Sequence, residues 1–302
     1  MTASGAPAPA FAREGIDRAA AERTRPGLLD DLRRDPRTRV LVVHGDRVPV
    51  TDGPRLHLLA PQDVTDAAAW AFLGRDGEAG VIAAILPADA DAPDIAPARW
   101  EALRVVGGEL GADDAGIAVE ALSLGRWLLA APFCPACGTR TEVVQAGWAR
   151  HCPGCGREHF PRTDPAIIVA VTSADRPERL LLGSNAAWAP GRYSCFAGFV
   201  EAGESLEAAV VREVAEEAGV DVVDVRYRGS QAWPYPRSLM LGFHAAARSD
   251  DAARADGEEI VEIRWFTREQ IGAAFAGEGD VTLPGTASIA YRLIRDWYEG
   301  AV

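Results

Sequence analysis

The feature that most constrains this chain is the segment from Gly198 to Val220, which reads GFVEAGESLEAAVVREVAEEAGV. It predicts a glycine-containing loop, then a helix from about Ser205 to Ala218. Ser205 is a favourable N-cap residue, because its hydroxyl can accept a hydrogen bond from a backbone N–H of the first turn. Gly219 can adopt the left-handed conformation that ends many helices. We therefore expect a loop followed by a helix with well-defined ends.

The acidic residues of this helix have an unusual placement. At about 100° per residue, Glu213 and Glu217 border the apolar face, with Glu216 to one side. Like charges three and four residues apart disfavour a helix by roughly 0.2–0.5 kcal/mol per pair, and the helix dipole adds to this near the C-terminal end. A solvated glutamate-rich face is the simpler interpretation of these residues alone. Three oxygen donors on one patch instead favour a hard cation such as Mg²⁺ or Mn²⁺, with Glu204 holding Arg212 beneath them.

The segment resembles the Nudix box, G-x5-E-x7-R-E-U-x-E-E-x-G-U, in which U is an apolar aliphatic residue. The fixed positions are all matched, by Gly198, Glu204, Arg212, Glu213, Val214, Glu216, Glu217, Gly219 and Val220. The resemblance implies a hydrolase that cleaves a pyrophosphate bond in a nucleoside diphosphate linked to another group, using divalent metal held on this helix. It also implies structural roles for Gly198, Glu204, Arg212 and Gly219.

Composition and charge narrow the classes of function. The chain has 302 residues, of which 48% are hydrophobic and 25% are charged, as in a soluble globular protein with room for two domains. Its formal charge of −13 argues against nonspecific nucleic-acid binding, which depends on neutralising phosphates. A nucleotide is still compatible, since a metal ion can bridge its phosphates to carboxylates. No apolar run approaches the roughly 18 residues of a membrane span, so no membrane partner is expected.

Residues 1–26 are expected to be a flexible leader. The first residues, MTASGAPAPAFAREG, contain no basic stretch and only a short run of alanine and proline. A secretory signal is therefore not expected. We expect a cytoplasmic location.

Four of the five cysteines form two CxxC motifs separated by fourteen residues, namely Cys134, Cys137, Cys152 and Cys155. Gly138 and Gly156 follow the motifs and let backbone N–H groups approach the thiolates. The alternatives are two disulfides or a redox pair, but a reducing compartment disfavours disulfides and a redox motif needs no second copy. Two complete motifs with no open ligand position indicate one structural zinc ion per chain. Cys195 is expected to be a small buried residue, since no histidine stands near it in sequence.

Residues 27–130 contain no clustered catalytic residues, and a packing or dimerisation domain is the preferred interpretation. Apolar runs predict strands at Arg39–His44, Leu56–Ala60, Ala69–Leu73 and Val81–Leu86. Helices are predicted at about Pro97–Leu110 and Asp114–Ala130. Residues 131–160 follow as a compact zinc-binding joint between the two halves.

Residues 161–302 are expected to form the catalytic domain of an α+β protein. Strands are predicted at Ala166–Thr172, Leu180–Gly183, Tyr193–Ala197, Val222–Gln231, Leu239–Ala246 and Glu258–Phe266. Short helical pieces are predicted at about Arg268–Phe275 and Thr286–Glu299. Mixed strands with a helix across them favour an α/β sandwich.

A second informative segment is the loop from Gln231 to Ser238, which reads QAWPYPRS. Its two prolines fix the backbone around two aromatic rings, which gives a stiff platform for stacking a flat ring. A rigid, half-buried crossover is an equally good interpretation of these residues alone. About ten residues after a Nudix helix, however, the loop resembles the SQPWPFPxS array of the NADH pyrophosphatase branch of that family. Ala232 replaces the first proline, and Tyr235 replaces phenylalanine but keeps the ring.

The branch resemblance covers most of the chain. It implies that residues 27–130 are a divergent Nudix-like domain, that residues 131–160 are a zinc ribbon, and that residues 161–302 are a catalytic Nudix α/β/α sandwich, usually in a homodimer. It implies that substrate is bound by Phe160, Phe199, Gln231, Ala232, Trp233, Pro234, Tyr235, Pro236, Arg237, Ser238 and Ser288. Arg104 is a further position near substrate, and Gly147 stands where some members carry an acidic residue.

The resemblance also implies the catalytic metal site. Two or three Mg²⁺ or Mn²⁺ ions would be held by the carbonyl of Ala197 and by Glu213, Glu216, Glu217 and Glu259. Glu258 is the alternative to Glu259, its neighbour in sequence. Of the catalytic residues Glu213, Glu216 and Glu217, we expect Glu217 to be the general base.

The expected reaction is hydrolysis of NADH, and of NAD⁺, to nicotinamide mononucleotide and AMP. One alternative is removal of the NAD cap from RNA 5′ ends by the same residues. Another is a generic Nudix hydrolase for ADP-ribose or other nucleoside diphosphate derivatives, against which the W-P-Y-P array argues. A zinc-ribbon adapter that binds without catalysis belongs to a different class, and three mutually repelling carboxylates beside a core argue against it.

Overall fold

The computed structural model describes residues 16–87 and 89–301. Contacts divide the chain into two compact units. The catalytic unit holds Asp164–Trp233 and the described residues from Ser238 onward. The N-terminal unit holds the described residues up to Thr163, together with Pro234–Arg237. Among the described residues, no helix combines the length and apolar composition needed to cross a bilayer.

Two of the three-stranded sheets of the N-terminal unit accompany a long helix, α3 (Ala112–Ala130). The first sheet has the order β1 (Arg39–Val43), β5 (Ala79–Ile85) and β4 (Ala69–Asp76). The second has the order β3 (Arg55–Leu56), β2 (Arg47–Thr51) and β6 (Arg99–Ala102). Helix α1 (Leu28–Arg34) contributes Leu28 and Leu32 to a core that also includes Phe72 and Ile82.

Three sequence predictions in this unit are wrong. The predicted helix at Pro97–Leu110 is strand β6 followed by a single turn, α2 (Leu103–Val106), because residues 99–102 pair with β2. The strand predicted at Leu56–Ala60 is reduced to β3. Of the leader predicted at residues 1–26, residues 1–15 lie outside the described part. The remainder includes a 3₁₀ helix, Ala20–Thr24, whose Glu22 forms an ion pair with Arg75, so these residues belong to the folded unit.

The zinc-ribbon segment forms a small antiparallel sheet within the N-terminal unit. Its strands are β7 (Glu142–Val144), β8 (Ala149–His151) and β9 (Glu158–His159), in that order. Each CxxC motif ends in a tight turn, in which Gly138 N–H donates to Cys134 O and Gly156 N–H donates to Cys152 O. Both glycines have positive φ angles, 74° and 73°, which explains why glycine follows each motif.

The catalytic unit is built on a six-stranded mixed sheet. Five strands follow the order β13 (Val222–Trp233), β14 (Ser238–Ala247), β10 (Asp164–Thr172), β11 (Arg179–Asn185) and β15 (Ile260–Thr267). The sixth, β12 (Phe196–Phe199), pairs antiparallel with β10 and sets Gly198 opposite Ile167. Strands β10 and β14 are parallel, and the remaining pairs are antiparallel.

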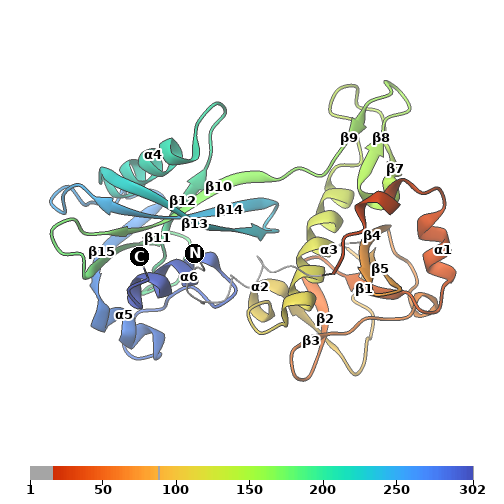
Figure 1. Cartoon of the computed structure of the whole chain (residues 1–302), viewed down its shortest axis with the longest axis horizontal. Helices are drawn as coiled ribbons and strands as arrows, with labels where there is room; N and C mark the ends of the chain where they lie inside the picture. Colours follow the sequence, from red (N-terminus) through yellow and green to blue (C-terminus); the bar gives the residue numbers. More distant parts are fainter. Residues whose placement is uncertain (1–15, 88, 302) are drawn as a thin grey trace. The chain divides into compact units, whose positions relative to one another are not determined.

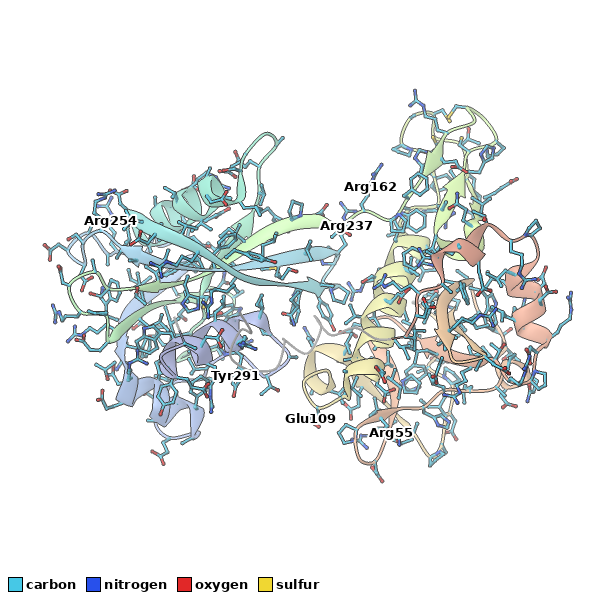
Figure 2. The ribbon with its side chains drawn as sticks, in the orientation of Figure 1. Arg55, Glu109, Arg162, Arg237, Arg254 and Tyr291 are labelled. Atoms are coloured by element: carbon cyan, nitrogen blue, oxygen red, sulfur yellow. The ribbon has the colours of Figure 1, made fainter. Side chains whose placement is uncertain are left out.

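Helices cover both faces of this sheet, as Figure 1 shows. Helix α4 (Leu206–Ala218) packs on one face through Val210 and Val214. Helices α5 (Arg268–Phe275) and α6 (Ile289–Tyr298) cover the other face through Ile271 and Trp297. The side chains in Figure 2 fill both layers. The predicted α/β/α sandwich of an α+β protein is confirmed.

Candidate active site

Helix α4 has the ends that its sequence predicts. The hydroxyl of Ser205 accepts a hydrogen bond of 3.2 Å from the backbone N–H of Ala208. Gly219 ends the helix in the left-handed conformation, with φ 65°. The helix therefore has a fixed start and a fixed stop, which sets the height at which each of its carboxylates lies above the sheet.

Arg212 links the helix to the preceding loop. Its guanidinium donates two hydrogen bonds of 2.9 Å to the two carboxylate oxygens of Glu204. It also donates to the backbone carbonyl of Phe199 at 3.0 Å and to Glu216 at 3.1 Å, and lies 2.8 Å from Glu213. One guanidinium thus connects the loop, the end of β12 and two carboxylates of the helix.

Glu204 is held in its ionised form by these contacts. The hydrogen bonds from Arg212, followed by one from the backbone N–H of Glu201, lower the pKa of Glu204 to about 2. The hydrogen bonds that Arg212 makes to Glu204, Glu213 and Glu216 raise the pKa of its guanidinium above the ordinary value. Glu204 and Arg212 are therefore both charged at neutral pH.

Glu217 lies in the most unfavourable environment of the acidic cluster. Only 5% of the residue is exposed, and its Oε2 atom has no hydrogen-bond partner among the described residues. Burial, then the charges of Glu259 and Glu213, raise the pKa of Glu217 to about 8, while the backbone of Ala197 opposes the shift. A buried, unpaired carboxylate oxygen beside two other carboxylates is the environment that a bound cation would satisfy.

Of the neighbours Glu258 and Glu259, it is Glu259 whose charge raises the pKa of Glu217, and Asp256 makes a smaller contribution in the same direction. Sequence reasoning missed the two residues that position Glu259. The carboxylate of Asp256 accepts hydrogen bonds from the backbone N–H groups of Glu258, Glu259 and Ile260 at 2.7–3.0 Å. The side chain of Asn185 donates to Glu259 Oε1 at 3.4 Å. The Asp-Gly dipeptide at residues 256–257 is a turn signal that would have indicated this loop.

Gly198 lies directly under Glu213. A Cβ atom built on Gly198 would lie 2.0 Å from the carboxyl carbon of Glu213, far inside van der Waals contact. The absence of a side chain at residue 198 therefore lets this carboxylate lie against strand β12. This is a specific reason for the glycine that opens the segment.

The carboxylates do not all converge on one point. Glu213 and Glu216 are turned toward Arg212, and Glu216 has an exposed side chain. Among the described residues, the four cysteines are the only group of three or more metal-donor side chains close enough to surround one ion. The donor set of the acidic cluster is nevertheless all oxygen, which suits Mg²⁺ or Mn²⁺, and the unpaired oxygen of Glu217 fits such an ion.

The amide of Gln231 is used inside the protein, so its predicted role in substrate binding needs correction. The residue is 1% exposed. Its side-chain nitrogen donates to Ala287 O, and its side-chain oxygen accepts from Ile289 N–H, both at 2.6 Å. Gln231 therefore fixes the residues on either side of Ser288 to strand β13. Ser288 itself is the N-cap of α6, and its hydroxyl accepts from Ala290 N–H at 3.1 Å.

The remaining residues of the predicted substrate loop lie in or between two strands. Ala232 and Trp233 end β13, where they pair with Leu239 and Ser238 of β14. Pro234, Tyr235, Pro236 and Arg237 form the connection between the strands, and Arg237 is labelled there in Figure 2. This connection is grouped with the N-terminal unit, in which the hydroxyl of Tyr235 accepts a hydrogen bond of 2.9 Å from Arg104 N–H.

The two phenylalanines predicted to stack on a base are both exposed. Phe199 ends β12, beside Gly198, and its carbonyl is held by Arg212. Phe160 follows β9 in the N-terminal unit. Large exposed apolar rings are costly to leave in water, so each is a candidate contact for a ligand.

The four ribbon cysteines converge, with all four sulfur atoms within 4.8 Å of one another. Cys134 and Cys152 are buried, and Cys137 and Cys155 are exposed. None of the four forms a disulfide. Four sulfur atoms at this separation fit a tetrahedral zinc ion.

Cys195 does not belong to either site. It is buried in the core beneath α5 and α6, and burial raises the pKa of its thiol to about 12. A thiol in that environment is a poor nucleophile. Its burial agrees with the expectation of a small core residue.

The chain is similar to known proteins along most of its length. Three family models match in succession: an NADH pyrophosphatase-like rudimentary NUDIX domain at residues 32–127, an NADH pyrophosphatase zinc ribbon domain at 130–160, and a NUDIX domain at 162–283. A protein of Mycobacterium tuberculosis named NAD-capped RNA hydrolase NudC is 41% identical over 96% of this chain and 94% of its own. A protein of the same name from Stutzerimonas stutzeri is 40% identical over 67% of this chain and 68% of its own length. A solved NUDIX hydrolase from Nitrosomonas europaea aligns with 55% of this chain and 90% of its own, at 23% identity and a TM-score of 0.42.

Proposed function

Because the chain belongs to the NADH pyrophosphatase branch of the Nudix hydrolases, we propose that it hydrolyses the pyrophosphate bond of NADH and NAD⁺ to nicotinamide mononucleotide and AMP. The observation that carries this proposal is the buried, unpaired carboxylate oxygen of Glu217 beside Glu213 and Glu259. An acidic cluster of this kind has no use in a zinc-ribbon adapter, but it suits hydrolysis of a pyrophosphate with divalent metal.

The proposed metal ligands are the oxygens of the acidic cluster. They are the carbonyl of Ala197 and the carboxylates of Glu213, Glu216, Glu217 and Glu259. Two or three Mg²⁺ or Mn²⁺ ions, when bound, would supply the positive charge that neutralises the pyrophosphate oxygens. The zinc ion of the ribbon would have a structural role, with Cys134, Cys137, Cys152 and Cys155 as its ligands.

The catalytic roles follow from where the chain holds its carboxylates. We assign Glu217 as the base that accepts a proton from the attacking water, whose oxygen forms the new bond to phosphorus as the bridging P–O bond breaks. Glu204 and Arg212 do not react. Their paired hydrogen bonds keep Glu213 and the loop after β12 in place.

Substrate recognition is assigned to the exposed aromatic residues. Phe199, next to the acidic helix, would stack on a base or on the nicotinamide ring. Trp233, Tyr235 and Phe160 are the other candidate rings. Gln231 would act on substrate only indirectly, because its amide holds the backbone on either side of Ser288.

Removal of the NAD cap from RNA 5′ ends is the second candidate function. It breaks the same bond, and the relative from Mycobacterium tuberculosis that matches 96% of this chain carries that activity in its name. The charge of −13 argues against a long RNA-binding surface, so recognition would be confined to the cap and the first nucleotides.

We further propose that the protein is a homodimer and that it is located in the cytoplasm.

The test is a comparison of hydrolysis rates for NADH, NAD⁺, ADP-ribose and NAD-capped RNA with Mg²⁺ or Mn²⁺. We expect AMP and reduced nicotinamide mononucleotide from NADH. The variant Glu217→Gln should lose turnover but keep the circular-dichroism spectrum of the parent. Glu207→Gln, an exposed change on the same helix, is the matched control and should keep full activity. Faster turnover of ADP-ribose than of either dinucleotide would rule out the proposed substrate class.

A further inference from the structure

The catalytic unit contains a cavity that the acidic site does not use. It has a volume of about 260 Å³ and is lined by residues of β13, β14, α5 and α6. Val210 and Val214 of α4 pack on one face of the sheet, whereas Trp297 of α6, which lines the cavity, packs on the opposite face. Figure 1 shows these helices on the two sides of the sheet. Pockets for drug-sized ligands measure about 300–1,000 Å³, so this cavity suits a compact group rather than a whole dinucleotide.

Three arginines line the cavity, and two of them are held by carbonyl oxygens. Arg228 donates to Ala301 O at 2.7 Å. Arg268 donates to the carbonyls of Trp297 and Tyr298, and its guanidinium lies 4.6 Å from the centre of the Trp297 ring. These contacts orient the guanidinium groups without neutralising their charge. Arg226 has no ion pair or side-chain hydrogen bond among the described residues, so its charge is available to a ligand.

A buried histidine completes the cavity wall. His244 pairs with Arg226 across the β13–β14 ladder and is only 5% exposed. Neither ring nitrogen has a hydrogen-bond partner of normal geometry among the described residues. Burial, then the charge of Arg228, lower the pKa of His244 to about 3, while the backbone of Leu293 opposes the shift. At neutral pH the ring is therefore uncharged, with one N–H donor that a bound anion would satisfy.

The charge of the cavity is positive although the chain as a whole carries −13. Against the three guanidinium groups stands Asp224, which also lines the cavity. Asp296 lies 3.7 Å from Arg228, but it is buried and bonded to Arg292 at 2.5 Å. An acidic protein that concentrates three arginines and an unsatisfied histidine in one small cavity has the chemistry of an anion site.

We propose that this cavity is a second ligand site, which binds one phosphate group through Arg226, Arg228, Arg268 and the ring N–H of His244. The group is either free phosphate or the phosphate of a monoester such as a mononucleotide. One guanidinium group can donate two parallel hydrogen bonds to two phosphate oxygens, and a tetrahedral anion can accept hydrogen bonds from several donors at once. The site is separate from the acidic cluster, and the proposal does not depend on the hydrolytic activity.

The experiment is isothermal titration calorimetry with inorganic phosphate and, in a second arm, with AMP. The protein keeps its zinc, and no Mg²⁺ or Mn²⁺ is added, so that phosphate is not drawn to the acidic cluster. Arg226→Ala should weaken the binding of phosphate and of AMP at least tenfold. The matched control is Arg55→Ala, an exposed arginine of the N-terminal unit labelled in Figure 2, which should leave the affinity unchanged. Both variants should hydrolyse NADH at the parent rate.

A second readout follows the histidine directly. The chain has five histidines, so the ring resonances of His244 can be resolved by NMR. Addition of phosphate should shift them in the parent and not in Arg226→Ala. If AMP binds more tightly than phosphate with the same dependence on Arg226, the natural ligand is a monoester; if phosphate binds as tightly, it is the free ion. Absence of binding up to about 10 mM, or equal affinity in parent and Arg226→Ala, would overturn the proposal.

Discussion

Replacing Gly198 by alanine tests whether the placement of Glu213 controls catalysis. The new Cβ would lie 2.0 Å from the carboxyl carbon of Glu213, whereas two carbon atoms in contact are about 3.5–4.0 Å apart. The carboxylate must therefore move by about 1.5 Å, because it is the mobile end of a side chain while Gly198 belongs to the β12–β10 ladder. A misplacement of about 1 Å in a catalytic group costs on the order of a hundredfold in rate.

We therefore expect Gly198→Ala to lower kcat for NADH by at least about a hundredfold, with little change in thermal stability. AMP release at saturating NADH and Mg²⁺ measures kcat, and a melting curve measures stability. The matched control is Gly111→Ala, because a Cβ there meets no atom within 4 Å. Retention of kcat within about threefold of the parent, in a folded Gly198→Ala protein, would refute the argument.

Three further changes test other parts of the structure. Gln231→Leu leaves Ala287 O and Ile289 N–H without their partner, so the melting temperature should fall, by the equivalent of about 1–3 kcal/mol per group. The parent should contain about one zinc ion per chain, and Cys137→Ser should contain less, because it removes one of the four sulfur ligands. Elemental mass spectrometry of the purified proteins measures the zinc content. Burial raises the pKa of Glu120 to about 7 from 4.5, so the parent should lose up to about 3 kcal/mol of stability as pH rises from 4.5 through 7. Glu120→Gln should not show this loss in urea unfolding at pH 5 and 8.

Local signals in the sequence predicted the bounds of the acidic helix α4 well. Ser205 and Gly219 set the bounds of α4 to within one residue, because capping is decided by neighbouring residues. The helix predicted at Pro97–Leu110 failed for the opposite reason. Residues 99–102 form a strand only because β2, some fifty residues earlier, offers them an edge, and no local pattern carries that information.

In the candidate site, too, features set by neighbouring residues could be predicted, whereas features set by distant residues could not. The acidic residues could be identified from their spacing, but the role of Gln231 could not, because its partners lie 56 and 58 residues away in sequence. Asn185 and Asp256 were missed because they act on Glu259 only after the strands assemble. Three-dimensional contacts, rather than residue types, distinguish the residues that contact a ligand from the residues that position them.

The hydrogen bonds of Arg212 restrict how sequences of this kind can diverge. Lysine carries the same charge but lacks the planar fork with which Arg212 binds both oxygens of Glu204 while reaching the Phe199 carbonyl. A change at Glu204 would in turn leave the guanidinium to compete more strongly for Glu213. We therefore expect these positions to change together, and an isolated change at any one of them to displace Glu213 and lower activity.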